Sequence, residues 1–315
     1  MTESVTVRVP ATTANLGPGF DCLGLSLDLW DEVTLAMGDA AASGRSVAAA
    51  SQAGALSHQS EDHQYQELVR LASERFFAET GCPAQELEIA CRRRIPLGRG
   101  LGSSAAAIVA GCVGANALAG TPLDWEELGR LAAQIEGHPD NSTPCLFGGF
   151  QVCILDEDRL VHQAVPFPEG LSCVLFIPDF ALPTHETRKL LPKELSRAEV
   201  VFQTSRAALL VAALATGSLE HLRVATEDRL HQPARGQVFT GMWTLFDAAV
   251  EAGALCAYLS GGGPTVLALA QARPERIRAA FDEAAKALGI AGRIMSVNPS
   301  AMGAQVVSGT TAVTS

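Results

Sequence analysis

Glycines and serines between residues 96 and 106 have the composition of an anion-binding loop. Three glycines alternate with other residues, and Ser103 and Ser104 follow at the start of a predicted helix of small residues. Glycine lets backbone N–H groups surround an oxyanion, and the N-terminus of a helix adds partial positive charge. The serine hydroxyls can cap the helix or bind a phosphate or a metal ion. Because a tight turn with a serine cap needs fewer glycines, we predict a phosphate site.

The loop differs from the two nucleotide-binding loops that it most nearly matches. Residues 100–105 fit G-x-G-x-x-A, but a dinucleotide fold requires a following strand with an acidic residue about twenty positions on. The next segment is instead a second predicted helix, with Asp124 in its first turn. The pattern G-x-x-x-x-G-K-[ST] does not occur, since Lys189, Lys193 and Lys286 lie elsewhere. A dinucleotide fold and a Walker-type NTPase are therefore both excluded.

Glu136 places a carboxylate on or beside the apolar stripe of the predicted helix Leu123–Glu136. The position also lies in the last helical turn, where the helix dipole disfavours an anion. Mg²⁺ shared with a serine hydroxyl would supply the missing positive charge. Contact with solvent or an ion pair with Arg130 is the alternative interpretation, and the residues alone leave both open.

His138, Asp140 and Asn141 form a dense polar cluster directly after this helix. Such residues beside a proline are also ordinary turn chemistry. The sequence has no nucleophile elbow, and its seven histidines show no zinc-ligand spacing. A serine-hydrolase triad and a zinc site are therefore excluded, but the cluster does not by itself reveal its role.

Composition limits the classes of partner and compartment. The 315 residues are 48% hydrophobic and 18% charged, enough for two packed domains of about 150 residues each. A net charge of -11 disfavours a nucleic-acid partner. Met1–Pro10 has neither a basic stretch nor an apolar one, so no signal peptide is expected, and the small apolar run Ala105–Gly120 is too short to cross a bilayer. Since the eight cysteines contain no C-x-x-C pair, we expect a cytoplasmic protein with reduced thiols and no membrane partner.

Hydrophobic periodicity predicts a mixed helix and strand protein without internal repeats. Residues 38–63 are expected to form a loop, Ser308–Ser315 a frayed tail, and Pro166 and Pro168 to mark a domain junction near residue 160. A helix over Leu123–Glu136 would begin at the cap Thr121-Pro122. Strands are predicted near 5–9, 33–37, 87–95, 150–155, 172–177, 255–259, 265–270 and 293–298, and helices near 65–79, 103–119, 123–136, 185–191, 196–216, 218–226, 237–252 and 274–288.

Three segments together resemble a known family, the GHMP small-molecule kinases, which act on galactose, homoserine, mevalonate and phosphomevalonate. Residues 96–106 are similar to its phosphate-binding motif, Asn15–Gly24 to its N-terminal motif and Ser260–Thr265 to its C-terminal glycine motif. Within the family, Asn15–Gly24 and Glu136–Asn141 are most similar to the homoserine kinase group. The matches run in consistent order over residues 10–270.

The resemblance implies an α+β fold with two domains and ATP bound between them. Residues 1–160 would form a ribosomal-S5-like N-terminal domain, and residues 161–315 a ferredoxin-like C-terminal domain. The implied reaction is ATP-dependent phosphorylation of the side-chain hydroxyl of L-homoserine to O-phospho-L-homoserine, in threonine biosynthesis. The alternatives are a GHMP kinase for another small alcohol such as mevalonate, or a non-catalytic binding protein of this fold. The oligomeric state stays open, with a homodimer as one option.

The resemblance also assigns roles to individual residues. Ser104 and Glu136 would hold Mg²⁺ and act in catalysis together with Asn141, which stands where other GHMP kinases place an Asp able to act as a base. Two departures concern Gly262, which replaces the usual serine, and Glu67, which replaces an asparagine of the adenine pocket. The implied phosphate-binding residues are Pro96, Leu97, Gly98, Arg99, Gly100, Leu101, Gly102, Ser103, Ser104, Ala105 and Ala106, with Gly261, Gly262 and Gly263 as the C-terminal glycine loop. The implied substrate-binding residues are Asn15, Asp21, His138, Asp140, Asn141, Arg188 and Arg235. Of these, Asp21 would bind the ammonium group of the amino acid, and the two arginines would bind its carboxylate.

Overall fold

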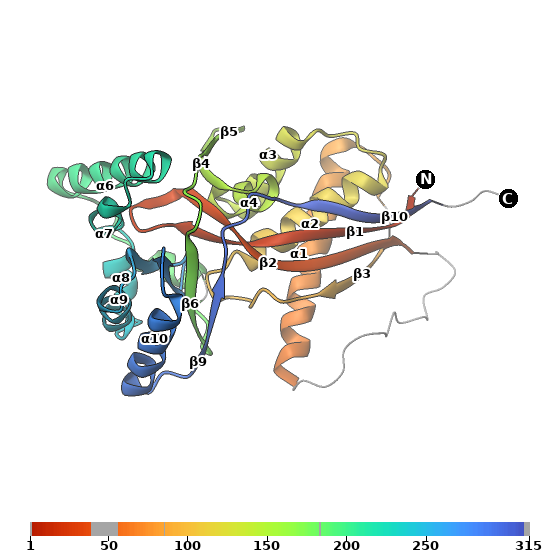
Figure 1. Ribbon diagram of the computed structural model, residues 1–315. Helices are drawn as coiled ribbons and strands as arrows, with labels where there is room; N and C mark the ends of the chain where they lie inside the picture. Colours follow the sequence, from red (N-terminus) through yellow and green to blue (C-terminus); the bar gives the residue numbers. More distant parts are fainter. Residues whose placement is uncertain (1, 39–55, 85, 183, 312–315) are drawn as a thin grey trace.

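Two β-sheets organise the chain (Figure 1). The computed structural model describes residues 2–38, 56–84, 86–182 and 184–311. The first sheet has the order β10-β1-β2-β4-β5, and β3 pairs with β2 beside this path. Its strands are β1 Thr2–Asn15, β2 Gly19–Met37, β3 Leu87–Arg92, β4 Phe150–Asp156, β5 Arg159–Val165 and β10 Gln305–Thr311.

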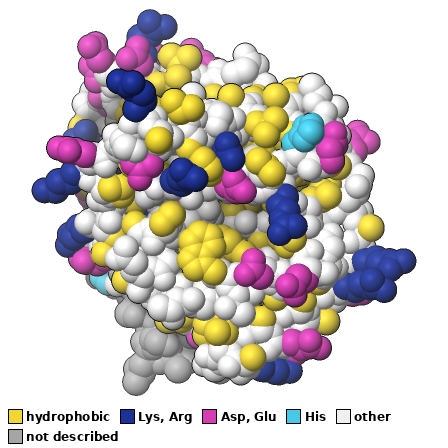
Figure 2. All heavy atoms as spheres, turned by 90° about the vertical axis from the view of Figure 1, so that its left-hand side faces the viewer, with side chains coloured by type: hydrophobic (Ala, Val, Ile, Leu, Met, Phe, Trp, Pro, Cys, Tyr) yellow, Lys and Arg dark blue, Asp and Glu magenta, His cyan; other side chains and the backbone are white. Residues whose placement is uncertain are grey.

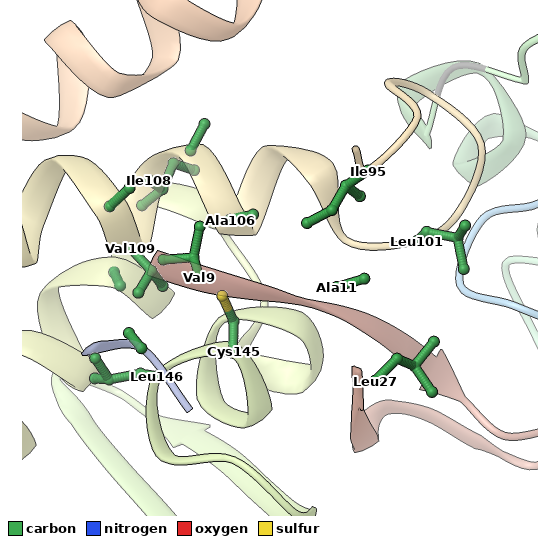
Figure 3. Packing of buried hydrophobic residues seen from close by; sticks show 14 of the residues in the cluster. Val9, Ala11, Leu27, Ile95, Leu101, Ala106, Ile108, Val109, Cys145 and Leu146 are labelled. Carbon is green, nitrogen blue, oxygen red and sulfur yellow. The ribbon is translucent and has the colours of Figure 1, made fainter. Parts of the chain in front are cut away.

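Four helices pack on this sheet, and the second of them lies at the centre of the hydrophobic core. Helix α2 is buried along nearly its whole length, and it contacts β1 on one side and α1 on the other. Figure 3 shows Val9 of β1 close to Ala106 and Val109 of α2, with Cys145 of α4 nearby. Small side chains on α2 allow these close approaches. The helices are α1 Leu56–Thr80, α2 Ser103–Leu118, α3 Trp125–Glu136 and α4 Pro139–Phe147.

The second sheet is antiparallel, with the order β7-β8-β6-β9. Helices α9 and α10 pack on it, and the chain order strand, helices, strand, strand, helix, strand gives the predicted ferredoxin-like arrangement. The strands are β6 Ser172–Pro178, β7 Cys256–Leu259, β8 Val266–Ala270 and β9 Gly292–Val297. The helices are α5 Thr184–Lys189, α6 Arg197–Thr216, η1 Leu219–His221, α7 Leu222–Ala225, α8 Gln232–Gly236, α9 Met242–Glu251 and α10 Pro274–Leu288.

The chain changes sheet after residue 165 and returns near its end. The domain division predicted between residues 160 and 161 falls inside β5, which pairs with β4 from Asp156↔Arg159 to Phe150↔Val165. Residues 305–311, partly expected to be a frayed tail, form β10 against β1. This pairing spans almost the entire chain, so local sequence gives little sign of it. Residues 312–315 lie outside the described part.

The predicted long helices are present in the structure, but several of their predicted boundaries are wrong. Helix α1 begins at Leu56, inside the predicted loop, whose residues 39–55 lie outside the described part. The cap of α3 is Asp124, not Thr121, because Asp124 and Glu127 form a reciprocal capping box. The polar cluster expected as a turn opens a further helix, α4, with Pro139 in its first turn. The helix predicted over 237–252 is shorter in the structure, where α9 begins at Met242, and the short helix α8 before it was not predicted.

Helix α6 is, by length and composition alone, the one helix in the described ranges that could cross a membrane. An 18-residue window of this helix has a mean hydropathy of 1.4, and 17% of the window is buried inside the molecule. One such helix is weak support for a membrane span, and Leu210, Ala213 and Leu214 pack inside the molecule. Figure 2, which views the side of α6–α10, shows hydrophobic side chains dispersed among charged ones. The absence of a membrane partner stays a prediction.

Replacement of Gly111 by alanine should destabilise the contact between α1 and α2. A Cβ atom there would lie 2.4 Å from the carbonyl oxygen of Val69, so the helices must move apart. We expect the free energy of unfolding to fall by about 1–2 kcal/mol, because overpacking outweighs the better helix propensity of alanine. Urea unfolding measures this change. The control Thr204→Ala, on the exposed side of α6, should stay within about 0.5 kcal/mol of wild type, and equal effects would contradict the close-approach argument.

Candidate active site

A cavity of about 640 Å³ brings the predicted motifs together. Its walls come from the Asn15–Asp21 loop, the glycine loop before α2, the start of α4, helices α1, α5 and α8, and the C-terminal glycine loop. A single cavity therefore draws on segments from residue 15 to residue 262. The predicted residues that line it are Asn15, Asp21, Gly98, Gly100, Gly102, Ser103, Ser104, Glu136, His138, Asp140, Asn141, Arg188, Arg235, Gly261 and Gly262, with Leu97.

The glycine loop needs glycine at its tightest contact with the second sheet. Gly100 has a φ of +75°, and a Cβ atom there would lie 2.2 Å from the carbonyl oxygen of Ser260. The hydroxyl of Ser260 donates to the Gly100 carbonyl at 2.6 Å and lies 2.8 Å from the hydroxyl of Thr13. Arg99 turns away from the cavity and donates to the carbonyls of Leu97, Pro178 and Asp179. The protein's own hydrogen bonds thus fasten the loop to both sheets.

Ser104 and Glu136 meet at the N-terminus of α2, as predicted. The Ser104 hydroxyl donates to Glu136 Oε1 at 2.6 Å, and the Glu136 side chain is 8% exposed. Burial raises the pKa of the Glu136 carboxyl, although His138 and the Ser104 hydrogen bond partly oppose the shift. A buried carboxylate beside a hydroxyl is a donor set that suits Mg²⁺, and a cation would keep the carboxyl ionised. The residues therefore fit the predicted metal ion.

The start of α4 fixes Asn141 through two hydrogen bonds. The hydroxyl of Thr12 donates to Asn141 Oδ1 at 2.8 Å, and Asn141 Nδ2 donates to Asp140 Oδ1 at 3.3 Å. Asp140 also bonds His138 Nδ1 at 2.7 Å. Burial opposes a positive charge on His138, but Asp140 and Glu136 outweigh it and raise the pKa of the imidazole. Thr12 was missed by the sequence analysis, since a threonine in a strand carries no motif.

Asp21 and Arg188, predicted to hold opposite ends of a substrate, face each other. The two guanidinium nitrogens Nη1 and Nη2 of Arg188 donate to the two carboxylate oxygens of Asp21, at 2.9 and 2.6 Å. The Arg188 guanidinium also lies 5.2 Å from the ring centre of Phe20. One oxygen of Asp21 lies within 4.8 Å of ligand atoms of His138 and Asp140, so this end of the cavity concentrates charge of both signs.

Arg235 is a buried cation with an incomplete set of partners. It is 1% exposed, and its Nη1 donates to His231 Nδ1 and to the carbonyl of Gly261, both at 2.8 Å. Its Nε has no hydrogen-bond partner among the described residues. Burial and the nearby Arg188 lower the pKa of Arg235 to about 10, so the side chain stays charged at neutral pH. Because the charge is buried and incompletely paired, an anion in the cavity would stabilise it.

Helix α1 forms the remaining wall, which the sequence analysis anticipated only at Glu67. The helix contributes both polar and apolar side chains, of which Leu68 and Leu71 could contact a flat base. Glu67 lies 3.7 Å from Arg70, on the side of the cavity made by α1. Phe20 also lines the cavity, but it was not among the predicted site residues although it lies within the Asn15–Gly24 motif. The α1 residues at the cavity are His63, Gln64, Glu67, Leu68 and Leu71.

Comparison with known proteins places this geometry in a family. Residues 66–149 match the GHMP kinases N terminal domain, and residues 210–287 match the GHMP kinases C terminal domain. A homoserine kinase of Moorella thermoacetica is 40% identical over 301 residues, covering 96% of this chain and 99% of that protein. The chain belongs to the GHMP kinase family. A homoserine kinase of Microchaete diplosiphon is 42% identical over 303 residues, covering 96% of this chain and 97% of the relative.

A solved structure supports the same assignment for this GHMP kinase. The crystal structure of homoserine kinase from Cytophaga hutchinsonii has a TM-score of 0.82 and 29% identity, covering 98% of each chain. The predicted fold class and family are therefore confirmed. The roles of the individual site residues stay predictions, because the comparison concerns whole chains.

Loss of the Thr12 hydroxyl should slow phosphoryl transfer by this GHMP kinase. Thr12→Val keeps the shape of the side chain but leaves the Asn141 amide free to rotate. We expect kcat to fall about 10-fold, the equivalent of one net hydrogen bond, with little change in the KM for ATP. Steady-state kinetics measures both values. Thr12→Ser retains the hydroxyl and is the control; a Val variant as active as the Ser variant would contradict the role given to Thr12.

Proposed function

We propose that this GHMP kinase transfers the γ-phosphoryl group of Mg-ATP to the side-chain hydroxyl of L-homoserine, giving O-phospho-L-homoserine for threonine biosynthesis. The relatives that match nearly the whole chain are named homoserine kinases. The proposed setting is the cytoplasm, with small molecules rather than nucleic acid or membrane as partners. Sedimentation would decide between a monomer and a homodimer.

The buried charge of Arg235 is the observation that carries the choice of substrate. A small alcohol without a carboxylate would leave this guanidinium buried and incompletely paired, which is costly. The α-carboxylate of an amino acid would complete its hydrogen bonds and neutralise its charge. Arg188 adds a second guanidinium at the same end of the cavity. Galactose has no carboxylate, and mevalonate has no ammonium group.

The acidic side chains suit the ammonium group of the same substrate. Asp21 and Asp140 line the cavity together, close enough for their oxygens to share one cation. In the structure, Arg188 forms an ion pair with Asp21. An amino acid brings one charge of each sign, so it can pair with both arginines and both carboxylates without changing the net charge of the cavity. This balance favours homoserine over mevalonate.

The phosphate groups of ATP would lie on the glycine loop and the N-terminus of α2. Its backbone N–H groups and the Ser103 hydroxyl, which is buried without a partner among the described residues, are available donors. Ser104 and Glu136 would hold Mg²⁺, which when bound would supply positive charge to neutralise the phosphate oxygens. An intact Ser104–Glu136 pair argues against a non-catalytic binding protein of this fold.

Asn141 orients the nucleophile rather than accepting its proton. An amide cannot act as a general base at neutral pH, and both ends of this one are already fixed by Thr12 and Asp140. Phosphoryl transfer through a loose transition state depends mainly on alignment and charge neutralisation. The homoserine hydroxyl therefore needs a fixed position more than a strong base. Its proton leaves late, to phosphate or to water.

A panel of alcohols tests the substrate and the role of Arg235 together. We expect ADP release with L-homoserine and little with mevalonate or galactose. Arg235→Leu should raise the KM for homoserine about 100-fold, the range for a buried charge pair, with a small effect on the KM for ATP. Preference for another alcohol would overturn the proposed substrate, and equal effects on both KM values would make Arg235 a structural residue.

Removal of the Glu136 charge should abolish most of the turnover. Glu136→Gln keeps the size of the side chain but weakens Mg²⁺ binding, and we expect kcat to fall about 10²–10³-fold. In wild type the Mg²⁺ requirement should rise as pH falls, because protonation of a carboxyl with a raised pKa competes with the metal. The variant should lose this pH dependence.

The matched control for this variant is Glu169→Gln, the same chemical change at an exposed position. It should leave kcat and the Mg²⁺ requirement at wild-type values. Near-normal kcat for Glu136→Gln at saturating Mg²⁺ would remove Glu136 from the metal site.

A further inference from the structure

One histidine ring determines how Arg235 is held. His231 and Arg235 are both almost completely buried. The ring Nε2 lies 2.7 Å from the carbonyl oxygen of Gly17, and Nδ1 lies 2.8 Å from Arg235 Nη1. A carbonyl oxygen only accepts, so Nε2 must carry the hydrogen and donate it. A neutral ring then has its lone pair at Nδ1, where it accepts a hydrogen bond from the guanidinium. The two contacts are therefore compatible with a single tautomer.

The surroundings of the ring favour this neutral state. Burial lowers the pKa of His231 far below its ordinary value, with Arg235 acting in the same direction, although Asp228 and the Gly17 carbonyl oppose the shift. A protonated ring would point an N–H group at Arg235 and place two positive charges in contact. The ring therefore stays neutral at neutral pH, and the Nδ1 lone pair accepts a hydrogen bond from Arg235.

The contacts of Nη1 decide which edge of the guanidinium remains available. Nη1 carries two hydrogens, and it donates them to His231 Nδ1 and to the Gly261 carbonyl. The other donors of the group are Nε and Nη2, and Nε has no partner in the described part of the chain. These two nitrogens form the side-on edge that can bind a carboxylate through two parallel hydrogen bonds. Arg235 lines the cavity.

We propose that His231 is the positioning residue for carboxylate recognition: its Nδ1 holds Arg235 so that the Nε–Nη2 edge serves the α-carboxylate of the substrate. This inference rests on the proposed function and adds a determinant of its specificity. The same ring is tied through Gly17 to the loop that supplies Asp21, and it lies 5.6 Å from the ring of Phe20. His231 therefore also sets the relation between the carboxylate partner and the acidic side of the cavity.

The ring is not needed to form the helix that carries Arg235. Asp228 already accepts hydrogen bonds from the backbone N–H groups of His231 and Gln232 at the start of α8, at 2.9 and 2.6 Å. Gln203 holds Asp228 in turn, at 2.6 Å. Substitution of the ring should consequently change the orientation of Arg235 more than the fold of this segment.

Two amide variants separate the two hydrogen bonds of the ring. Asn places an amide oxygen near the position of Nδ1, so His231→Asn can still accept from Arg235 while losing the Gly17 contact. Gln places an amide nitrogen near the position of Nε2, so His231→Gln can keep the Gly17 contact while losing the acceptor for Arg235. The probe substrates are L-homoserine and 3-aminopropan-1-ol, which is homoserine without its carboxylate.

We expect the KM for homoserine to rise about 10-fold or more in His231→Gln and markedly less in His231→Asn, since the lost bond involves a charged group. The KM for ATP and the kcat/KM for 3-aminopropan-1-ol should change little in either variant. The opposite order of the two variants, or equal losses on both substrates, would make His231 a structural tie between loops and overturn the proposal.

A measurement that does not depend on activity tests the tautomer. In the ¹⁵N spectrum of the wild-type protein, Nε2 of His231 should be protonated and Nδ1 unprotonated at neutral pH, with the assignment made by loss of the signal in His231→Gln. A protonated Nδ1 would overturn the proposal, whatever the substrate. If the tautomer is as expected but wild type ignores homoserine, the proposed function fails, and carboxylate recognition by His231 fails with it.

Discussion

The carbonyl oxygen of Gly261 is the point on which the site depends. It accepts hydrogen bonds from Asn15 at 3.0 Å and from Arg235 at 2.8 Å, and its own loop is bonded to the glycine loop before α2 through Ser260. The first sheet, α8 and the second sheet are therefore joined at one backbone group. A shift of one sheet against the other would therefore move the glycine loop before α2 away from Arg235 and the other charged residues of the cavity.

Two charged side chains are buried close to the glycine loop that the Gly261 contacts hold in place. Arg235 and Glu136 are both removed from solvent, and burial displaces the pKa of each in the direction that disfavours its charge. Neither charge is matched fully by the protein, whereas Asp21 and Arg188 match each other. Under the proposed function, Arg235 would be matched by the carboxylate of an amino acid and Glu136 by a metal ion. Ligand binding would neutralise the two buried charges that the folded protein itself pairs only in part.

The sequence predicted those parts of the structure whose causes are local. The glycine loop and the helix from Ser103 follow from residue types and helical spacing. The pairing of Ser104 with Glu136 came from the family resemblance, and the structure brings the two side chains together. Features that depend on distant pairing were missed. β10 forms only because β1 offers an edge, and Thr12 reaches Asn141 across 129 positions of sequence. No window of the sequence contains either cause.

The ion pair of Asp21 and Arg188 was also beyond sequence reasoning, and it shows how the site treats charge. The resemblance assigned the two residues to opposite ends of the substrate, and the structure places them in contact. Homoserine carries the same two charges on groups attached to one carbon atom, so under the proposed function it would exchange partners with the pair instead of meeting two unpaired ions. Asn141 and the ring of His231 are both uncharged, and each orients its neighbour through a hydrogen bond instead of through a charge of its own. A site built to bind a triphosphate gains more from oriented neutral groups than from another ionised side chain. A further carboxylate would repel the phosphate groups, and a further cation would compete with a bound metal ion.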